Sequence, residues 1–369
     1  MEGEDNKLTC LVIGDPHFKV TEMKASIAMG KEILRIATEQ QPDFIVCLGD
    51  TLDRHETIHT DPLCEAVSWL LQLKKIAPVY LLIGNHDRPN NSDFLSSRHP
   101  FTAIKEWPGI VVVDQVMVQE IKGQPFFFVP YVPPGRLQEA LDTIGWSPTG
   151  YHHQPWVCGF THQEIYGIKM GTIISEKGDQ WPTDWPLLIN GHIHDRDIPQ
   201  PNVISIGTPR QHAFGESPDK ALSVFIFHQK NIWQEEKIPL NLPKKIIHRL
   251  MTKEFLTYTP PGWSEDCPLT DDLKIEIYGT GADIQACMKL EKVKVFRKMG
   301  IKIVTKDLDA RKNKENIDLD TSNIVINDTP FRERLAQRVR GDEEVEKVYK
   351  RIFGLTQQRS TRKVKITRK

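Results

Sequence analysis

The 369-residue sequence lacks any apolar run of the roughly 20 residues that a membrane-spanning helix needs. Its first ten residues, MEGEDNKLTC, carry acidic side chains where a secretory signal would have a basic patch and an apolar run. The six cysteines include no CxxC pair, so we interpret them as reduced, buried and structural. We therefore expect an intracellular protein of the cytoplasm or nucleus, with no membrane association.

The sequence also lacks a strong overall charge. The net charge of −1 gives no general attraction to nucleic acid, so any such binding must depend on local patches. One local patch is the segment 347–369, which contains nine Lys or Arg residues and no acidic residue. A solvated chain end and a segment that binds DNA or a partner are both consistent with this composition.

Five short apolar runs each end abruptly in a polar cluster. They begin near Leu8, Phe44, Val79, Trp156 and Leu187, and they end in GDPH, GDTLD, GNHD, THQE and NGHIH. Segments 23–40 and 62–73, which lie between the first three runs, have helical spacing of apolar residues. This alternation predicts an α/β fold with a buried parallel sheet, and such sheets bind ligands beyond the carboxyl ends of their strands.

Three regions are expected along the chain. A hairpin at 222–238 closes the first domain, 1–238, and a small β-α-β module with a helix near 283–298 occupies 239–327. Segment 328–369 begins with Thr329-Pro330, a signal for the start of a helix, and contains two apolar stripes with helical spacing. These two helices would dock either on their own domain or on a partner.

The polar clusters contain the side chains needed for a site with two divalent metal ions, which in phosphoester hydrolysis lie about 3.5–4 Å apart. Alternate residues of an extended segment point the same way, so the pairs in DPH and HIH can each face one cluster. Imidazole combined with carboxylate favours manganese, iron or zinc over magnesium. The predicted metal ligands are Asp15, His17, Asp50, Asn85, His162, His192 and His194.

The motifs DxH, GDxxD, GNHD, a single downstream histidine and GHxH resemble, in this order, those of the calcineurin-like metallophosphoesterases. The resemblance covers about the first 235 residues and implies a four-layer αββα sandwich. It implies one metal held by Asp15, His17 and His194, another held by Asn85, His162 and His192, and Asp50 as the bridge between them. It further implies that His86 contacts the phosphate or protonates the leaving oxygen.

Three residues near these motifs are additional candidates for catalysis or for contact with the substrate. Asp87 could accept the ring N–H of His86 and fix its orientation, and we count both residues as catalytic. Arg54 and Arg88 are candidates for contact with the substrate, although each could equally form a surface salt bridge.

The segment IGTPRQHAFGE at 206–216 is similar to the one that follows GHxH in SbcD-type repair nucleases, the meiotic-recombination-eleven family. That similarity makes Arg210 and His212 substrate-binding candidates. It implies a small βαβ cap and a C-terminal helical element that docks on an SMC-like ATPase. One residue departs from the pattern, because Asp53 stands where these nucleases often have histidine. The same segment and THQE also look like phosphoesterases of large DNA viruses and phages.

The leading hypothesis is a DNA exonuclease or endonuclease of repair or recombination, with two divalent metals, manganese favoured over iron, zinc or magnesium, that activate water. Its expected partners are DNA and the ATPase subunit of an SbcCD-type complex, and a homodimer is left open. The alternative is a phosphoesterase for small nucleotides or phosphoproteins. A third hypothesis is an inactive scaffold, against which the intact ligand set and His86 weigh.

Overall fold

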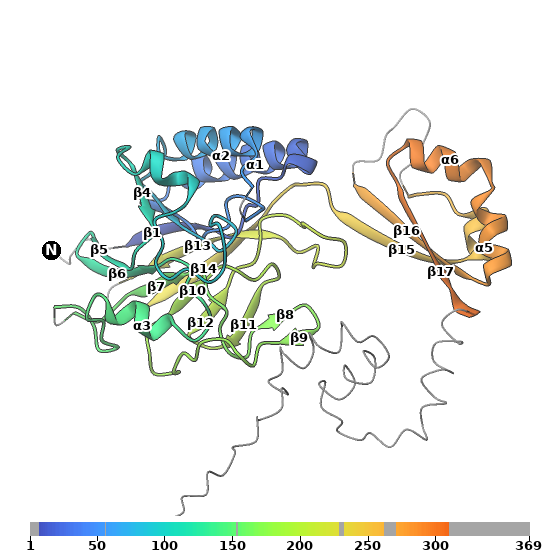
Figure 1. The fold of residues 1–369 in the computed structure, drawn as a ribbon. Coiled ribbons are helices and arrows are strands. Elements are labelled where there is room, and N and C mark those ends of the chain that lie inside the picture. The colour runs from blue at the N-terminus through green and yellow to red at the C-terminus, as the bar shows by residue number, and fades with distance from the viewer. Residues whose placement is uncertain (1–6, 56, 153, 229–231, 262–270, 310–369) are drawn as a thin grey trace, which may run out of the picture.

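The computed structural model describes residues 7–309 except 56, 153, 229–231 and 262–270 (Figure 1). The helix pair and basic tail expected at 328–369 lie outside the described residues. Two six-stranded sheets pack face to face, and a three-stranded sheet follows them in the chain. None of the described helices is long and apolar enough to cross a membrane.

The first sheet has the strand order β14-β13-β1-β2-β3-β4. Its central strands β1 to β4 are parallel, and the hairpin β13–β14 adds to β1 in antiparallel fashion, as predicted for 222–238. Helices α1 (Met23–Gln40) and α2 (Thr60–Leu73) cover the outer face of this sheet (Figure 1). The strands are β1 (Leu8–Ile13), β2 (Phe44–Cys47), β3 (Val79–Leu82), β4 (Ile110–Val113), β13 (Ala221–Phe227) and β14 (Trp233–Pro239).

The second sheet has the order β11-β12-β10-β7-β6-β5 and packs its inner face against the first. Its outer face is covered by α3 (Leu137–Asp142) and by a cluster of tryptophans. Its strands are β5 (Met117–Ile121), β6 (Gln124–Val129), β7 (Cys158–Thr161), β10 (Leu188–Asn190), β11 (Asp197–Gln200) and β12 (Val203–Ser205). The fold is therefore the expected α/β sandwich, in which the two sheets lie between a layer formed by α1 and α2 and a layer that contains α3.

Strand β1 shows how the sequence produces these layers. Leu11 and Ile13 pack in the core beneath α1 and α2, whereas Cys10 and Val12 pack in the core between the two sheets. Successive side chains of a strand point to opposite faces, so a strand buried on both faces must be apolar at every position. Burial on both faces therefore explains why the apolar runs in the sequence are unbroken.

The three-stranded sheet belongs to a separate α/β module with its own apolar core. Its strands β15 (Lys245–Met251), β16 (Asp272–Gly279) and β17 (Lys302–Asp307) are parallel in the order β15-β16-β17. The expected β-α-β part is present, but the single helix predicted near 283–298 is wrong. The chain instead forms α5 (Gly281–Met288) and α6 (Glu291–Lys298), and α4 (Thr252–Thr257) follows the unanticipated strand β15. The break occurs at Leu290, whose backbone is extended.

Short elements complete the described part of the chain. They are η1 (Val20–Glu22), η2 (Pro100–Ile104) and the two-stranded ribbon of β8 (Lys169–Met170) and β9 (Ile173–Ile174). Four of the five described cysteines are free and buried, as predicted. Cys64 is exposed, and the prediction is wrong there because this residue lies on the solvent side of α2.

Candidate metal centre

The structure brings all seven predicted ligands together at the carboxyl ends of strands from both sheets. Asp15 and His17 follow β1, while Asp50 and Asn85 follow β2 and β3. The second sheet contributes His162 after β7, and His192 and His194 after β10. Loops at one end of parallel strands converge, which explains how residues 177 positions apart, such as His17 and His194, come into contact.

The seven side chains form two adjoining groups. Ligand atoms of Asp15, His17 and His194 lie within 4.8 Å of one another, and so do those of Asp50, His162 and His192. Asn85 belongs to the second group, because its Oδ1 lies 3.0 Å from both His162 Nε2 and His192 Nδ1. Asp50 also approaches the first group, with Oδ2 at 3.8 Å from His17 Nε2. This grouping is the one that the family resemblance implies.

The first group has the donor chemistry of a cation site. Nδ1 of His17 faces the carbonyl of Leu52 at 3.2 Å, and Nδ1 of His194 faces a Glu216 carboxylate oxygen at 3.0 Å. Each Nδ1 must therefore carry the proton, which leaves a lone pair on each Nε2 of a neutral ring. These two Nε2 atoms lie 3.1 Å apart. Two lone pairs at this distance repel each other, whereas a cation between the two nitrogens would be coordinated by both.

The second group repeats this arrangement. Nδ1 of His162 lies 2.7 Å from the Leu48 carbonyl, so its Nε2 presents a lone pair in the neutral ring. That Nε2 lies 3.3 Å from Asp50 Oδ2 and 3.0 Å from the Asn85 side-chain oxygen, both of which also accept hydrogen bonds. The buried Asp15 Oδ2 has no hydrogen-bond partner among the described residues. The residues present therefore fit two divalent ions.

The backbone of the centre explains the glycines in its motifs. A Cβ at Gly49 would lie 2.7 Å from His162 Nδ1, and one at Gly84 would lie 2.2 Å from the Asp50 nitrogen. Three proposed ligands, His17, Asp50 and His192, have φ values of 44°, 46° and 72°, a left-handed conformation that is costly for residues other than glycine. The close approach of the loops therefore requires glycine beside the ligands and strains the ligands themselves.

The buried carboxyl groups and imidazole rings of the centre shift one another's pKa values. Burial disfavours the charged form of His162, yet Asp50 and Asp15 together raise its pKa to about 9. Burial, reinforced by the charge of His162, lowers the pKa of His192 to about 3. Burial also raises the pKa of Asp15 to about 6. The buried carboxyl groups of Asp15 and Asp50 therefore favour positive charge beside them, which a proton on His162 supplies in part and a bound cation could supply instead.

His86 lies at the rim of the centre. Its backbone N–H donates to Asp50 Oδ1 at 2.7 Å, and its Nδ1 lies 2.7 Å from the carbonyl oxygen of Asp53. The ring stacks on His55 with 4.5 Å between centroids, and its Nε2 lies 4.0 Å from Asp50 Oδ2. The side chain is 32% exposed, so the ring contacts both the metal centre and solvent.

The expected contact between Asp87 and the His86 ring is wrong. The Asp87 carboxylate instead accepts backbone N–H groups of Leu52 at 2.9 Å, Gly84 at 3.1 Å and Thr51 at 3.2 Å. It thereby ties the loop after β2 to the loop after β3. Because the carbonyl of Asp53 orients the His86 ring, Asp87 positions the loops of the centre rather than the histidine.

The four predicted substrate contacts differ in their surroundings. The guanidinium of Arg88 is buried and donates to the carbonyls of Tyr131 and Asp93, whereas that of Arg210 donates to Glu22 and to the Gln211 carbonyl. Arg54 is exposed. Among the described residues, neither ring nitrogen of the buried His212 has a partner, and its ring lies 4.9 Å from that of His17. Arg54 is therefore open to solvent, whereas the buried Arg88, Arg210 and His212 each keep at least one side-chain nitrogen without a hydrogen-bond partner among the described residues.

Comparison with known proteins identifies the family. The model of the family "Calcineurin-like phosphoesterase" matches residues 8–196. "Putative phosphoesterase 078R" of Invertebrate iridescent virus 3 is 40% identical over 250 residues, which cover 68% of this chain and 71% of that protein. The chain is a calcineurin-like phosphoesterase. "Putative phosphoesterase 244L" of Invertebrate iridescent virus 6 is 41% identical over 256 residues, 67% of this chain and 87% of that protein.

A solved structure, "GAP50 the anchor in the inner membrane complex of Plasmodium", aligns with 13% identity and a TM-score of 0.39 over 64% of this chain and 89% of that chain. Similarity at this level says nothing about function. Metallophosphoesterases use divalent metal ions, in agreement with the two ligand clusters. The family match ends at Arg196, before the loop 206–216.

Several residues of the phosphoesterase centre gave no usable sequence signal. Glu216 contacts Nδ1 of His194 and also accepts the backbone N–H groups of His212 and Ala213. It stands in the segment IGTPRQHAFGE, but nothing in that pattern marks a glutamate as a partner of a histidine 22 residues away. The carbonyls of Leu48 and Leu52, which orient His162 and His17, are backbone groups that every residue type provides.

Proposed function

We propose that this calcineurin-like phosphoesterase is a two-metal phosphodiesterase that cleaves the backbone of DNA, as an exonuclease or endonuclease in repair or recombination. The observation that carries the proposal is the convergence of histidine lone pairs and carboxylates on two adjoining points, with His86 at their rim. We propose Asp15, His17 and His194 as ligands of one ion, Asn85, His162 and His192 as ligands of the other, and Asp50 as the bridge.

The bound ions would supply Lewis acidity at the phosphate and an activated water molecule at neutral pH. Among the residues of this chain, His86 has the geometry of the proton donor. Its Nδ1–H donates to the Asp53 carbonyl, so Nε2 holds the exchangeable proton on the side that faces both the centre and solvent. From Nε2 the proton can pass to the leaving oxygen.

Support for DNA as the substrate comes from the loop 206–216. This segment is the one that resembles SbcD-type nucleases, and two of its residues contact the metal centre. Glu216 bonds His194, and the ring of His212 packs against those of His17 and His194. Both ring nitrogens of His212 are without partners among the described residues, so this ring is a candidate contact for a substrate phosphate.

Manganese is the proposed metal, with iron, zinc and magnesium as alternatives, because the ligands mix imidazole with carboxylate. The deciding experiment incubates the purified protein and each metal with labelled linear DNA, with bis(p-nitrophenyl) phosphate and with p-nitrophenyl phosphate. We expect manganese-dependent cleavage of DNA and of the diester, and loss of both with EDTA. Activity on mononucleotides or phosphoproteins, without cleavage of DNA, would favour the alternative substrate classes.

A partner is also proposed. By resemblance to SbcD-type proteins, segment 328–369 would dock on an SMC-like ATPase of an SbcCD-type complex, and a homodimer is an alternative assembly. The module of β15, β16 and β17 occupies the position in the chain where those proteins have a cap. The remaining hypothesis, an inactive scaffold, is disfavoured by the complete ligand set and by the position of His86 at its rim.

A further inference from the structure

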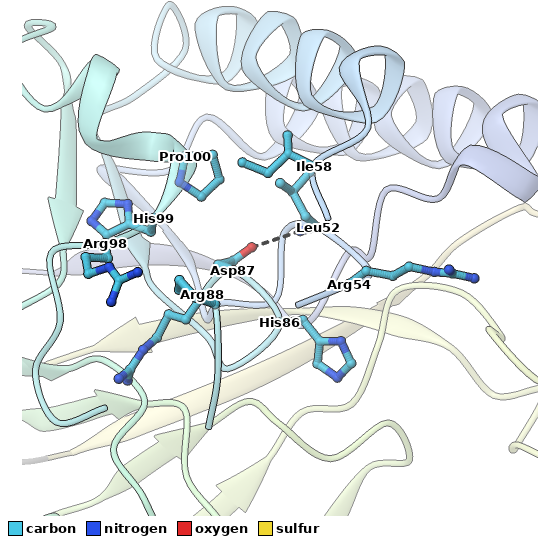
Figure 2. A pocket seen from close by; sticks show the side chains of 10 residues that line it. Leu52, Arg54, Ile58, His86, Asp87, Arg88, Arg98, His99 and Pro100 are labelled. Atoms are coloured by element: carbon cyan, nitrogen blue, oxygen red, sulfur yellow. Dashed lines mark hydrogen bonds between the residues drawn. The ribbon is translucent and has the colours of Figure 1, made fainter. Parts of the chain in front are cut away.

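A cavity of about 460 Å³ opens beside His86, between the loop after β2 and the start of η2 (Figure 2). Leu52, Ile58, Pro89 and Pro100 contribute apolar atoms to its wall. Ile58 is 54% exposed, so its side chain presents apolar surface on the wall of the cavity. The volume lies within the range of about 300–1,000 Å³ that is typical of ligand pockets.

Two cationic side chains stand on opposite sides of this cavity, Arg54 on one and Arg98 on the other (Figure 2). Both are exposed, and neither guanidinium has a hydrogen bond or ion pair within the described part of the chain. The third arginine of the wall, Arg88, differs because both terminal nitrogens of its guanidinium already donate to backbone carbonyl groups. Two unpaired positive charges thus flank an apolar surface.

The carboxylates near the cavity do not neutralise these charges. Asp87 lines the wall but is held by three backbone N–H groups, and Asp53 pairs with Lys19 at 2.9 Å. The ligand that suits the cavity therefore has an apolar, planar or ring-shaped part with anionic groups on both sides of it. A nucleoside within a nucleic-acid strand has this form, because a phosphate precedes and follows each sugar and base.

We propose that this cavity binds the nucleoside on the leaving-group side of the scissile phosphate, and that Arg54 and Arg98 bind phosphates of the neighbouring nucleotides. His86 supports this assignment because its ring borders both the cavity and the metal centre. The inference rests on the proposed DNA phosphodiesterase function and deepens it by assigning the subsite that holds the strand. A phosphomonoester or a phosphopeptide lacks one or both of these features.

The arginines are tested with two substrates of the holoenzyme. One is a short single-stranded DNA with one ordinary phosphodiester between phosphorothioate linkages, which fixes the cleavage position and keeps the flanking charges. The other is bis(p-nitrophenyl) phosphate, which has no flanking phosphate. Arg98→Ala should lower the ratio of kcat/KM for DNA to that for the diester about tenfold, since the variant can no longer form a charge-assisted hydrogen bond that only DNA offers.

Electrostatic binding of the strand has a second readout in the salt dependence. For each phosphate of a single strand that the protein no longer binds, the slope of log kcat/KM against log salt concentration should flatten by about 0.7. Arg98→Lys should recover part of the lost preference for DNA and part of the salt dependence. Arg54→Ala should behave like Arg98→Ala. The matched control is Arg297→Ala, which removes an exposed arginine on α6 in the separate module.

The apolar wall is tested with abasic substrates. Ile58→Ser should lower kcat/KM for the intact DNA severalfold, and Ile173→Ser, at a comparably exposed isoleucine of β9, is the control. An abasic nucleotide is placed first on one side of the cleavable linkage and then on the other. When the base on the leaving-group side is missing, Ile58→Ser should not lower kcat/KM any further.

The outcomes separate this inference from the proposed function. If the wild-type protein hydrolyses bis(p-nitrophenyl) phosphate but no DNA, the nuclease function fails and the inference fails with it. If the wild type cleaves DNA while Arg98→Ala keeps both the substrate ratio and the salt slope, the nuclease stands and the cavity assignment is wrong. Equal losses on both substrates would likewise overturn the assignment.

Discussion

Arg210 donates a 2.7 Å hydrogen bond to Glu22, although 188 positions separate them in the chain. The second carboxylate oxygen of Glu22 accepts from Lys245 at 2.9 Å. Arg210 lies in the loop that carries His212 and Glu216, and Lys245 is the first residue of β15. One carboxylate therefore links the metal-centre loop to the start of the three-stranded module.

Glu22→Gln should loosen this link and destabilise the fold. Arg210 is buried and would lose its charged partner, so we expect the free energy of unfolding to fall by about 1.5–3 kcal/mol, measured in urea. The control is Glu39→Gln, because Glu39 pairs with Arg35 at the exposed surface of α1, where solvent screens an ion pair and leaves it little effect on stability. Equal effects of the two substitutions would show that the link does not stabilise the protein.

Asp50→Ala should abolish hydrolysis of every substrate, because both ion sites lose a ligand. Elemental analysis after dialysis should find fewer than two metals per chain. Manganese at about 100 times its dissociation constant should stabilise the wild type by about 2.7 kcal/mol, and the variant by less. Near wild-type turnover by an Asp50→Ala protein loaded with metal would refute the two-metal mechanism.

His86→Ala should retain both metals while turnover falls by about 10²–10⁴-fold, the usual contribution of general acid–base catalysis. The reason is that its Nε2 faces the centre without belonging to either ligand group. Metal content and kcat are measured on the same preparation. Loss of metal from this variant would instead place His86 among the ligands.

Asp87→Asn should affect stability more than His86→Ala does. The amide group cannot accept all three backbone N–H groups that the carboxylate now binds, so we expect a loss of about 1–3 kcal/mol in the free energy of unfolding. Thermal unfolding of the two variants side by side provides the measurement. A stable Asp87→Asn protein with strongly reduced turnover would restore the catalytic role predicted from the sequence.

A truncation after Asn327 should keep metal-dependent cleavage of bis(p-nitrophenyl) phosphate, since all seven proposed ligands precede that point. Association with an SMC-like ATPase from the same source should be lost, and DNA binding should become weaker and less salt-dependent. Co-purification and a salt titration provide the measurements. An unchanged complex, or an insoluble truncated protein, would mean that segment 328–369 completes the fold instead of docking on a partner.

The sequence alone predicted the five strands whose ends carry the proposed ligands. An apolar run such as 44–48 predicts a strand buried on both faces, and the polar residue that ends it must lie at the sheet edge. The candidate ligands followed from this rule, because each of them lies within four residues of the strand end that positions it. Asp15, Asp50 and His162 can all be placed in this way from the order of residues alone.

Only the tertiary structure decided how the neighbouring groups are used. Asp87 follows His86 in sequence but bonds backbone N–H groups of two loops, and Asp53 orients His86 through a carbonyl that any residue type would supply. Arg88 and Arg98 look alike in sequence, yet one is buried against carbonyls and the other stands exposed at the cavity. Such differences depend on contacts between distant segments, whereas periodicity and motif spacing record only what lies nearby along the chain.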